Sequence, residues 1–334
     1  MTIRERQERD EEARLSPYAA LSSRSAGRAH PISTCDLRTC YQRDRDRIIH
    51  CKSFRRLKYK TQVFLTPMGD HYRTRLTHTL EVSQVARTLA RSLRLNEDLT
   101  EAAALGHDLG HTPFGHIGES TLNRLLPGGF RHNEQSLRVA ERLENDGQGL
   151  NLCRETLDGI LNHSGQNEPK TLEGWCVRRA DRIAYINHDI DDAIRGGILK
   201  PFELPRRCLS VLGETHGERI DTMIREIVTT SMDQPFVRMS EEVRQASEEL
   251  RAFLFEYVYH DEWRKKEEAR CDYILSALYE HYLAHPEQLP AEYLEINFTE
   301  GAERAVCDFI ACMTDRYAID QFSEIFVPGA FGRR

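Results

Sequence analysis

Two segments, R-T-R-L-T-H-T-L-E-V-S-Q-V-A-R-T-L-A-R at residues 73–91 and A-A-A-L-G-H-D-L-G-H-T-P-F-G-H-I-G-E at residues 102–119, decide how this chain folds. Between Arg75 and Glu119 the sequence places four histidines and an aspartate in otherwise apolar, small-residue surroundings. Such a concentration of groups that can bind a metal ion is the most informative feature of the chain.

Hydrophobic periodicity predicts one helix in each segment. At 100° per residue, His78 shares an apolar stripe with five aliphatic positions, Val82, Val85, Ala86, Leu89 and Leu93. The second helix, expected from about Leu99 to Leu109, ends its apolar side with His107 and Asp108. A lone inward histidine is usually a satisfied core residue, but inward histidines and an aspartate on neighbouring helices would be costly to bury without partners. A shared cation is the simplest partner.

The composition excludes several classes of protein. A net charge of −7 with 30% charged residues is typical of a soluble globular chain, and 334 residues are enough for a single all-helical enzyme. No apolar run is long enough to span a membrane, and the charged start has no signal-peptide core. The nine cysteines include no C-x-x-C pair. Reduced thiols and a cytoplasmic location are therefore expected.

Residues 1–34 are polar and are expected to form an arm that is mobile or docks a partner. Residues 41–60 then carry a local excess of positive charge over Asp44 and Asp46. Two interpretations stay open for this basic segment: a solvated helix face with pairs four residues apart, or a site for an anion such as phosphate. Single-stranded nucleic acid is a possible weak partner of the same charges.

The remaining sequence also predicts helices. Residues 66–70 predict a turn before the first core helix, and Pro113 with its neighbouring glycines breaks the helix after the second. His132 follows a Pro-Gly-Gly turn, and His163, at the end of an apolar run, is interpreted as structural. A helix at 177–193 carries Asp181, Tyr185, Asp189 and Asp192 on one side and isoleucines on the other, before Gly196 and Gly197 end it. No strand-period run occurs, so the fold class is all-α.

The pattern of His78, then His107-Asp108, then Asp181 resembles the H…HD…D signature of the HD-domain metal-dependent phosphohydrolases. Four longer blocks are similar to the deoxynucleoside triphosphate triphosphohydrolases, the dGTPase-like branch: R-D-R-D-R-I-I-H-C-K-S-F-R-R-L-K-Y-K-T-Q-V-F, H-D-L-G-H-T-P-F-G-H-I-G-E, D-R-I-A-Y-I-N-H-D-I-D-D-A-I-R and D-F-I-A-C-M-T-D-R-Y-A. The resemblance covers nearly the whole chain. It implies an HD-domain helical bundle with flanking helices, a single domain at 35–334 with its HD core at about 60–200 and a C-terminal helical region at 201–334.

The resemblance implies hydrolysis of a deoxynucleoside triphosphate to deoxynucleoside and inorganic triphosphate, by water attack at the α-phosphorus. Its metal ligands are His78, His107, Asp108 and Asp181, which suit Mn, Mg, Co, Fe, Ni or Zn. The resemblance assigns proton transfer to His116 with Glu119, which would act either as an acid toward the 5′-oxygen or as a base toward water. His111 and His132 match positions that assist this proton transfer or contact phosphates.

The resemblance also implies a set of substrate contacts. Arg75 and Arg182 match phosphate contacts, and Tyr185 matches the aromatic residue that excludes a 2′-hydroxyl. Gln62 and Asp189 match residues that recognise the 3′-hydroxyl. Family members commonly form homo-oligomers, and some respond to a second nucleotide as an effector.

Two alternatives remain beside this interpretation. One is an HD-domain enzyme acting on another nucleotide as a nucleotidase or phosphodiesterase, and free triphosphate among the products would distinguish the two. The other is a non-catalytic nucleotide sensor or nucleic-acid scaffold, which does not require His116. Base preference and the physiological metal are open.

Overall fold

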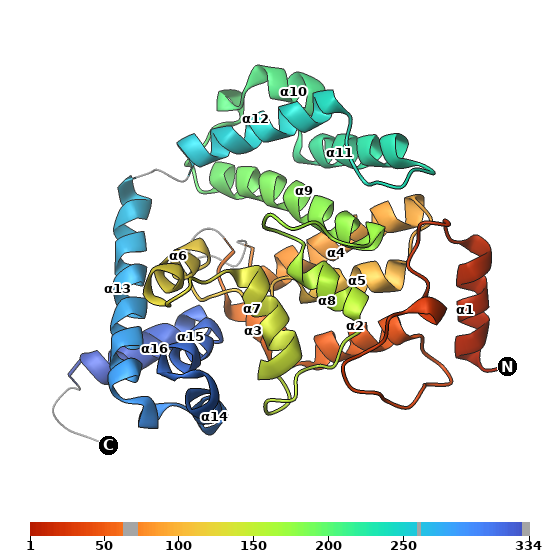
Figure 1. Cartoon of the computed structure of the whole chain (residues 1–334). Coiled ribbons are helices and arrows are strands. Elements are labelled where there is room, and N and C mark those ends of the chain that lie inside the picture. Colours follow the sequence, from red (N-terminus) through yellow and green to blue (C-terminus); the bar gives the residue numbers. More distant parts are fainter. Residues whose placement is uncertain (63–72, 259–261, 329–334) are drawn as a thin grey trace.

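A computed structural model describes residues 1–62, 73–258 and 262–328. These residues form an all-helical protein, as predicted (Figure 1). Within the described ranges, β-pairing is limited to two isolated bridges, Arg28 with Cys153 and Thr61 with Thr74. The α-helices are α1 Ile3–Arg14, α2 Cys40–His50, α3 Lys52–Arg56, α4 Arg75–Ser92, α5 Glu97–Gly106, α6 His116–Leu125, α7 His132–Arg138, α8 Arg154–Leu161, α9 Leu172–Arg195, α10 Arg206–Leu212, α11 His216–Ser231, α12 Glu241–Tyr257, α13 Glu262–Ala284, α14 Ala291–Glu300, α15 Ala302–Ala311 and α16 Asp315–Phe326. The turn predicted at 66–70 lies outside the described residues.

Local sequence explains where the central helices begin and end. The hydroxyl of Thr74 accepts a hydrogen bond from the Thr77 backbone N–H and starts α4, and Thr171 starts α9 through Gly174 in the same way. These side chains satisfy backbone N–H groups that have no partner within the helix. α9 stops at Gly196, the residue where the sequence predicts its end. No helix of the described ranges is both long and apolar enough to cross a membrane.

A first core joins α4, α5 and α9 with the helices that lie above α9 in Figure 1. Val82 and Leu89 from α4 meet Ile183 and Ile186 from α9, and all four are buried. Because α4, α5 and α9 share this core, the residues at their polar margins are held at fixed separations. His78, His107-Asp108 and Asp181 lie at that margin.

A second core lies at the other end of the molecule. It combines α6 with α13, α14, α15 and α16, the blue helices at the lower left of Figure 1. Phe114, from the loop between α5 and α6, belongs to this core together with Leu122 and Phe309. The loop that carries His107 and His111 and leads into His116 is therefore packed against the C-terminal region.

The polar segment 1–34, expected as an arm, is placed against the body of the protein. Arg28 forms a buried ion pair with Asp44 and also donates to the Cys40 and Asn151 carbonyls. The Ala20 N–H donates to the buried Glu173 carboxylate at 2.9 Å. These contacts anchor the segment after α1, whose own side chains are not buried.

Several positively charged side chains of the basic segment 41–60 form contacts within the fold. Arg45 pairs with Asp98 and Glu101, and Arg47 donates to the Leu150 carbonyl at 2.6 Å. Lys60 is only 2% exposed. For these three residues, neither a solvated helix face with pairs four residues apart nor an anion site describes the observed contacts. The composition of the segment does not show which of its positively charged side chains the fold will bury.

Candidate active site

Four side chains with metal-binding groups converge where α4, α5 and α9 meet. His78 Nε2 lies 3.1 Å from Asp181 Oδ1, and His107 Nε2 lies 3.8 Å from the same oxygen. Asp108 Oδ2 lies 3.6 Å from His107 Nε2. His78, His107 and Asp108 are almost completely buried, and their ligand atoms lie close enough together to share one cation. The structure therefore brings together all four predicted metal ligands.

The chemistry of this donor set fits a divalent cation. His107 Nδ1 donates to the Ala104 carbonyl at 2.6 Å, so its Nε2 carries the lone pair, and that atom is buried with no hydrogen-bond partner. Two imidazole nitrogens with two carboxylates are typical ligands of divalent transition metals. Burial opposes the ionisation of Asp181, but its hydrogen bond to His78 and the nearby His107 hold its pKa well below the usual range.

Arg75 orients one of these carboxylates. Its Nη1 lies 2.8 Å from Asp108 Oδ2, while its Nε and Nη2 donate to the carbonyls of Thr61 and Gln62. Burial raises the pKa of Asp108, but Arg75 and the surrounding histidines outweigh it and hold that pKa well below the ordinary value. The predicted phosphate contact of Arg75 is thus accompanied by a direct role in holding a predicted metal ligand.

A second group of side chains lies beside the first and is centred on Glu119. Its carboxylate accepts from His132 Nδ1 at 2.9 Å and lies 3.8 Å from His116 Nδ1. Burial opposes ionisation, yet the nearby His116 and the hydrogen bond from His132 hold the pKa of Glu119 well below its usual range. For His132, burial lowers the pKa, but the bond to Glu119 outweighs it and the net pKa is raised. Glu119 and His132 therefore form a charged pair.

His111 has a contrasting environment. It is 1% exposed, and neither of its ring nitrogens has a hydrogen-bond partner among the residues that the structure describes. Burial and the adjacent Arg75 lower its pKa well below the ordinary value, so the ring is neutral. Its ring stacks on that of His132 with centroids 4.9 Å apart. A buried imidazole that lacks protein partners is arranged to bind something that enters the cavity.

The sequence pattern indicates a structural role for His163, but the structure places this residue in the same group. Its Nδ1 donates to the Ile160 carbonyl at 2.7 Å, and its Nε2 lies 3.2 Å from His132 Nε2. Burial and the nearby His107 lower the pKa of His163 to about 3, so the neutral ring accepts from His132. No local signal distinguishes this histidine, because its importance comes from α7 packing beside α8.

These groups open into one cavity of about 410 Å³. Of the predicted substrate-binding residues, Gln62, Arg75, Arg182 and Tyr185 line it, and Asp189 is buried on α9 without lining it. The cavity is also lined by residues that the sequence analysis did not assign to the site: His163, Ser164, Gly165, Arg178, Arg251 and Phe255. Arg251 and Phe255 come from α12, whose own sequence shows only a charged amphipathic helix.

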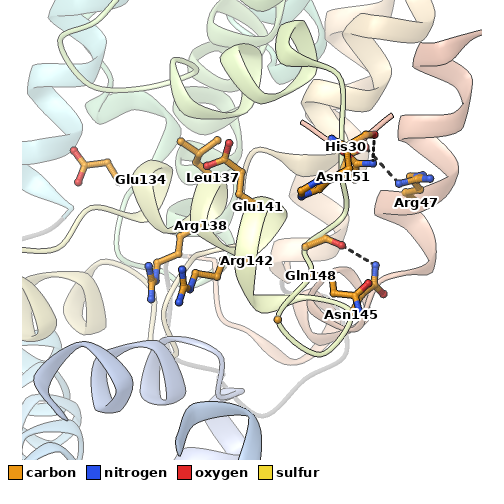
Figure 2. Close-up of a pocket in the computed structure, with 12 residues that line it drawn as sticks. His30, Arg47, Glu134, Leu137, Arg138, Glu141, Arg142, Asn145, Gln148 and Asn151 are labelled. Carbon is orange, nitrogen blue, oxygen red and sulfur yellow. Dashed lines mark hydrogen bonds between the residues drawn. The ribbon is translucent and has the colours of Figure 1, made fainter. Parts of the chain in front are cut away.

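A larger cavity of about 880 Å³ lies elsewhere, between α7 and the loop that follows it (Figure 2). Its Arg138 and Arg142 are paired with Glu300, and Arg138 also with Asp308. Asn145 donates to the Gly149 carbonyl at 2.8 Å. Among its described lining residues, no buried side-chain polar atom lacks a partner. Size alone therefore does not mark the functional site.

Comparison with known proteins gives two domain matches. Residues 75–186 match the HD domain, and residues 237–324 match the phosphohydrolase-associated domain. A deoxyguanosinetriphosphate triphosphohydrolase-like protein of Caldanaerobacter subterraneus subsp. tengcongensis is 58% identical over 98% of this chain and 97% of its own length. A protein of the same description from Clostridium perfringens is 51% identical over 98% of both chains. A solved structure of a hypothetical protein from Aquifex aeolicus aligns with a TM-score of 0.45 at 20% identity, covering 85% of this chain and 71% of its own.

Proposed function

Because this chain belongs to the family of deoxyguanosinetriphosphate triphosphohydrolase-like proteins, we propose that it hydrolyses deoxynucleoside triphosphates to deoxynucleoside and inorganic triphosphate. The family and the HD domain support the coarser assignment, a phosphohydrolase acting on nucleotides. One observation carries the finer proposal: a four-residue metal-ligand cluster shares a cavity with a buried, unpartnered histidine and a Glu119–His132 pair.

His78, His107, Asp108 and Asp181 would hold the divalent cation. When bound, the cation would supply charge neutralisation on the phosphate and would make water a better nucleophile. Arg75 keeps Asp108 ionised and oriented through its 2.8 Å contact. The identity of the cation is open among Mn, Mg, Co, Fe, Ni and Zn.

His111 and His116 contact the phosphate and the leaving group. The neutral His111 ring has a free N–H to donate to a phosphate oxygen, which would satisfy a buried polar atom. His116 is half-exposed at the cavity and points its Nδ1 toward the ionised Glu119. A carboxylate in this position orients the ring and stabilises its imidazolium form, whose Nε2–H would deliver a proton to the departing 5′-oxygen and leave the neutral ring. The reverse assignment, with His116 taking a proton from water, uses the same contact.

The sugar occupies the part of the cavity near Tyr185. The Tyr185 ring lies 6.3 Å from that of His116, between centroids. Within the described part of the chain, the buried side-chain oxygen of Gln62 has no hydrogen-bond partner, and Gln62 lines the same cavity, where this oxygen would accept from a sugar hydroxyl. Excluding the 2′-hydroxyl sterically while binding the 3′-hydroxyl is an effective way to select deoxyribose. Arg182 lies on the cavity wall as a phosphate contact, and Asp189 supports the sugar end from within α9.

A product assay tests the proposal. Each of the four deoxynucleoside triphosphates is incubated with the full-length protein and one divalent metal at a time, and products are separated by anion exchange. The expected products are deoxynucleoside and inorganic triphosphate in equal amounts, with no reaction in EDTA. Release of monophosphate, pyrophosphate or orthophosphate instead would overturn the proposal and favour a nucleotidase or phosphodiesterase. A second deoxynucleoside triphosphate in parallel reactions tests the expected effector, and sedimentation tests the expected homo-oligomer.

A further inference from the structure

The loop between α5 and α6 has an unusual backbone. Phe114 has φ of 60° and Gly115 follows with φ of 61°. A bulky residue rarely adopts this left-handed conformation, because its Cβ approaches the following carbonyl oxygen too closely. Such strain persists only where the surrounding structure imposes it. The loop matters because it begins beside His111 and ends at His116, the first residue of α6.

Two charged residues far away in the sequence bind this loop. Asp315, the first residue of α16, accepts the Phe114 N–H at 2.9 Å with one oxygen and the Thr61 N–H at 2.9 Å with the other. Lys60 Nζ donates to the His111 carbonyl and, at 2.8 Å, to the Ala311 carbonyl at the end of α15. The loop is therefore bonded at both of its ends, at His111 and at Phe114.

The burial of Lys60 shows that this arrangement is specific. An ammonium that is only 2% exposed is costly unless it is hydrogen-bonded, and burial lowers the pKa of Lys60 to about 8. Its hydrogen bonds go to two backbone carbonyls, one from the active-site loop and one from the C-terminal region. Phe114 itself, 3% exposed, is packed into the core formed by that region.

We propose that Asp315 and Lys60 are positioning residues, which hold the His111–Gly115 loop in its strained conformation and so direct His111 and His116 into the cavity. The phosphohydrolase-associated domain, residues 237–324, thereby supports the chemistry from outside the HD domain, because α15 and α16 keep the catalytic loop in place. The expected effect on the rate rests on the proposed hydrolysis. The expected dependence of the loop conformation on Asp315 does not rest on that function.

Asp315→Asn is the variant of choice, because it keeps the size of the side chain but presents an amide N–H₂ to one of the two backbone N–H donors. Asp320→Asn is the matched control on the same helix, where Asp320 makes only an exposed 3.7 Å pair with Arg316. If Asp315→Asn does not fold, Asp315→Glu replaces it, because this variant keeps the charge but moves it by one methylene. The same measurements and the same expected results then apply.

Three properties of the full-length proteins are compared: kcat and KM, bound metal, and hydrogen–deuterium exchange of the peptide covering 111–116. We expect Asp315→Asn to lower kcat roughly 10- to 100-fold at temperatures where it is folded, since displacing catalytic groups by about 1 Å has effects of that size. Exchange at 111–116 should accelerate, whereas bound metal and exchange in α4 and α9 should match the wild type. Asp320→Asn should match the wild type throughout.

Two results overturn the inference: a kcat within about twofold of the wild type, or unchanged exchange at 111–116. A purely structural role for Asp315 would lower the unfolding temperature without changing kcat of the folded protein. If the wild type hydrolyses no deoxynucleoside triphosphate, the proposed function fails by itself. The exchange measurement then still decides whether Asp315 holds the loop.

Discussion

Gly110→Ala tests how closely α7 must approach the metal-ligand segment. Gly110 lies between Asp108 and His111, and an added Cβ would sit 2.8 Å from Gln135 Cβ and overlap the backbone of Gln135 and Ser136. Ordinary contact begins at 3.4 Å. α7 must therefore retreat by at least 0.6 Å, the difference between these two distances, and by more to clear the backbone.

That retreat breaks specific contacts. The Gly110 N–H donates to Ser136 Oγ at 2.9 Å, and the same hydroxyl donates to the His107 carbonyl at 2.6 Å. Losing both bonds and overpacking the contact should destabilise the protein by roughly 2–4 kcal/mol. Because α7 begins with His132, the stacked pair of His132 and His111 should separate as well, with a loss in kcat on the order of 100-fold.

Urea unfolding followed by far-ultraviolet circular dichroism measures the first effect, and the product assay measures the second. Gly217→Ala is the control, since nothing lies within 4 Å of a Cβ added there in α11 and its φ is not positive. That variant should be more stable by about 0.5 kcal/mol and fully active. A Gly110→Ala protein with the unfolding midpoint and kcat of the wild type would refute the steric argument.

Three further predictions concern the site itself. His116→Ala should abolish turnover, while elemental analysis should find as much bound metal as in the wild type. Asp181→Asn should instead lose the metal. An active His116→Ala protein would exclude the proposed proton transfer. Tyr185→Ala should bring the rates with GTP and dGTP closer together, and equal rates in the wild type would remove the sugar-selection argument. Because Glu119 raises the pKa of His132 above its ordinary 6.5 against the effect of burial, their pair stabilises the protein fully below that pH and is lost as the pH rises through the raised pKa. The stability difference between wild type and His132→Asn, measured in EDTA, should therefore shrink as the pH rises above 6.5 and through the raised pKa of His132, and a difference that grows would contradict this sign.

The helices were predictable because their apolar positions repeat with the helical period. α4 and α9 show this clearly: inward residues such as Val82 and Ile186 pack in one core, and α9 ends at the predicted glycine. Periodicity predicted that His78, His107 and Asp108 point inward, and the resemblance to the HD-domain phosphohydrolases named them and Asp181 as candidate ligands. The cation that these four residues would bind stays a prediction. The roles of the residues around them stay predictions as well.

Other features depend on packing that no local pattern encodes. Arg251 faces the cavity because α12 packs across α9, and the sequence of α12 does not show which helix it will meet. Lys60 belongs to a run of cations but is buried, and its acceptors lie 51 and 251 residues further along the chain. Long-range contacts of this kind explain why the wall of the cavity was less predictable than its centre.

The site draws on two separate hydrophobic cores, and this division has a thermal consequence. The proposed metal ligands lie on or directly after helices of the first core, whereas Phe114 and α6 belong to the second. If the C-terminal helices loosen first on heating, the protein will keep its cation after it has ceased to turn over substrate. Recording cation release and enzymatic rate along one temperature ramp would reveal two successive transitions, and a single coincident one would show that the cores melt as a unit.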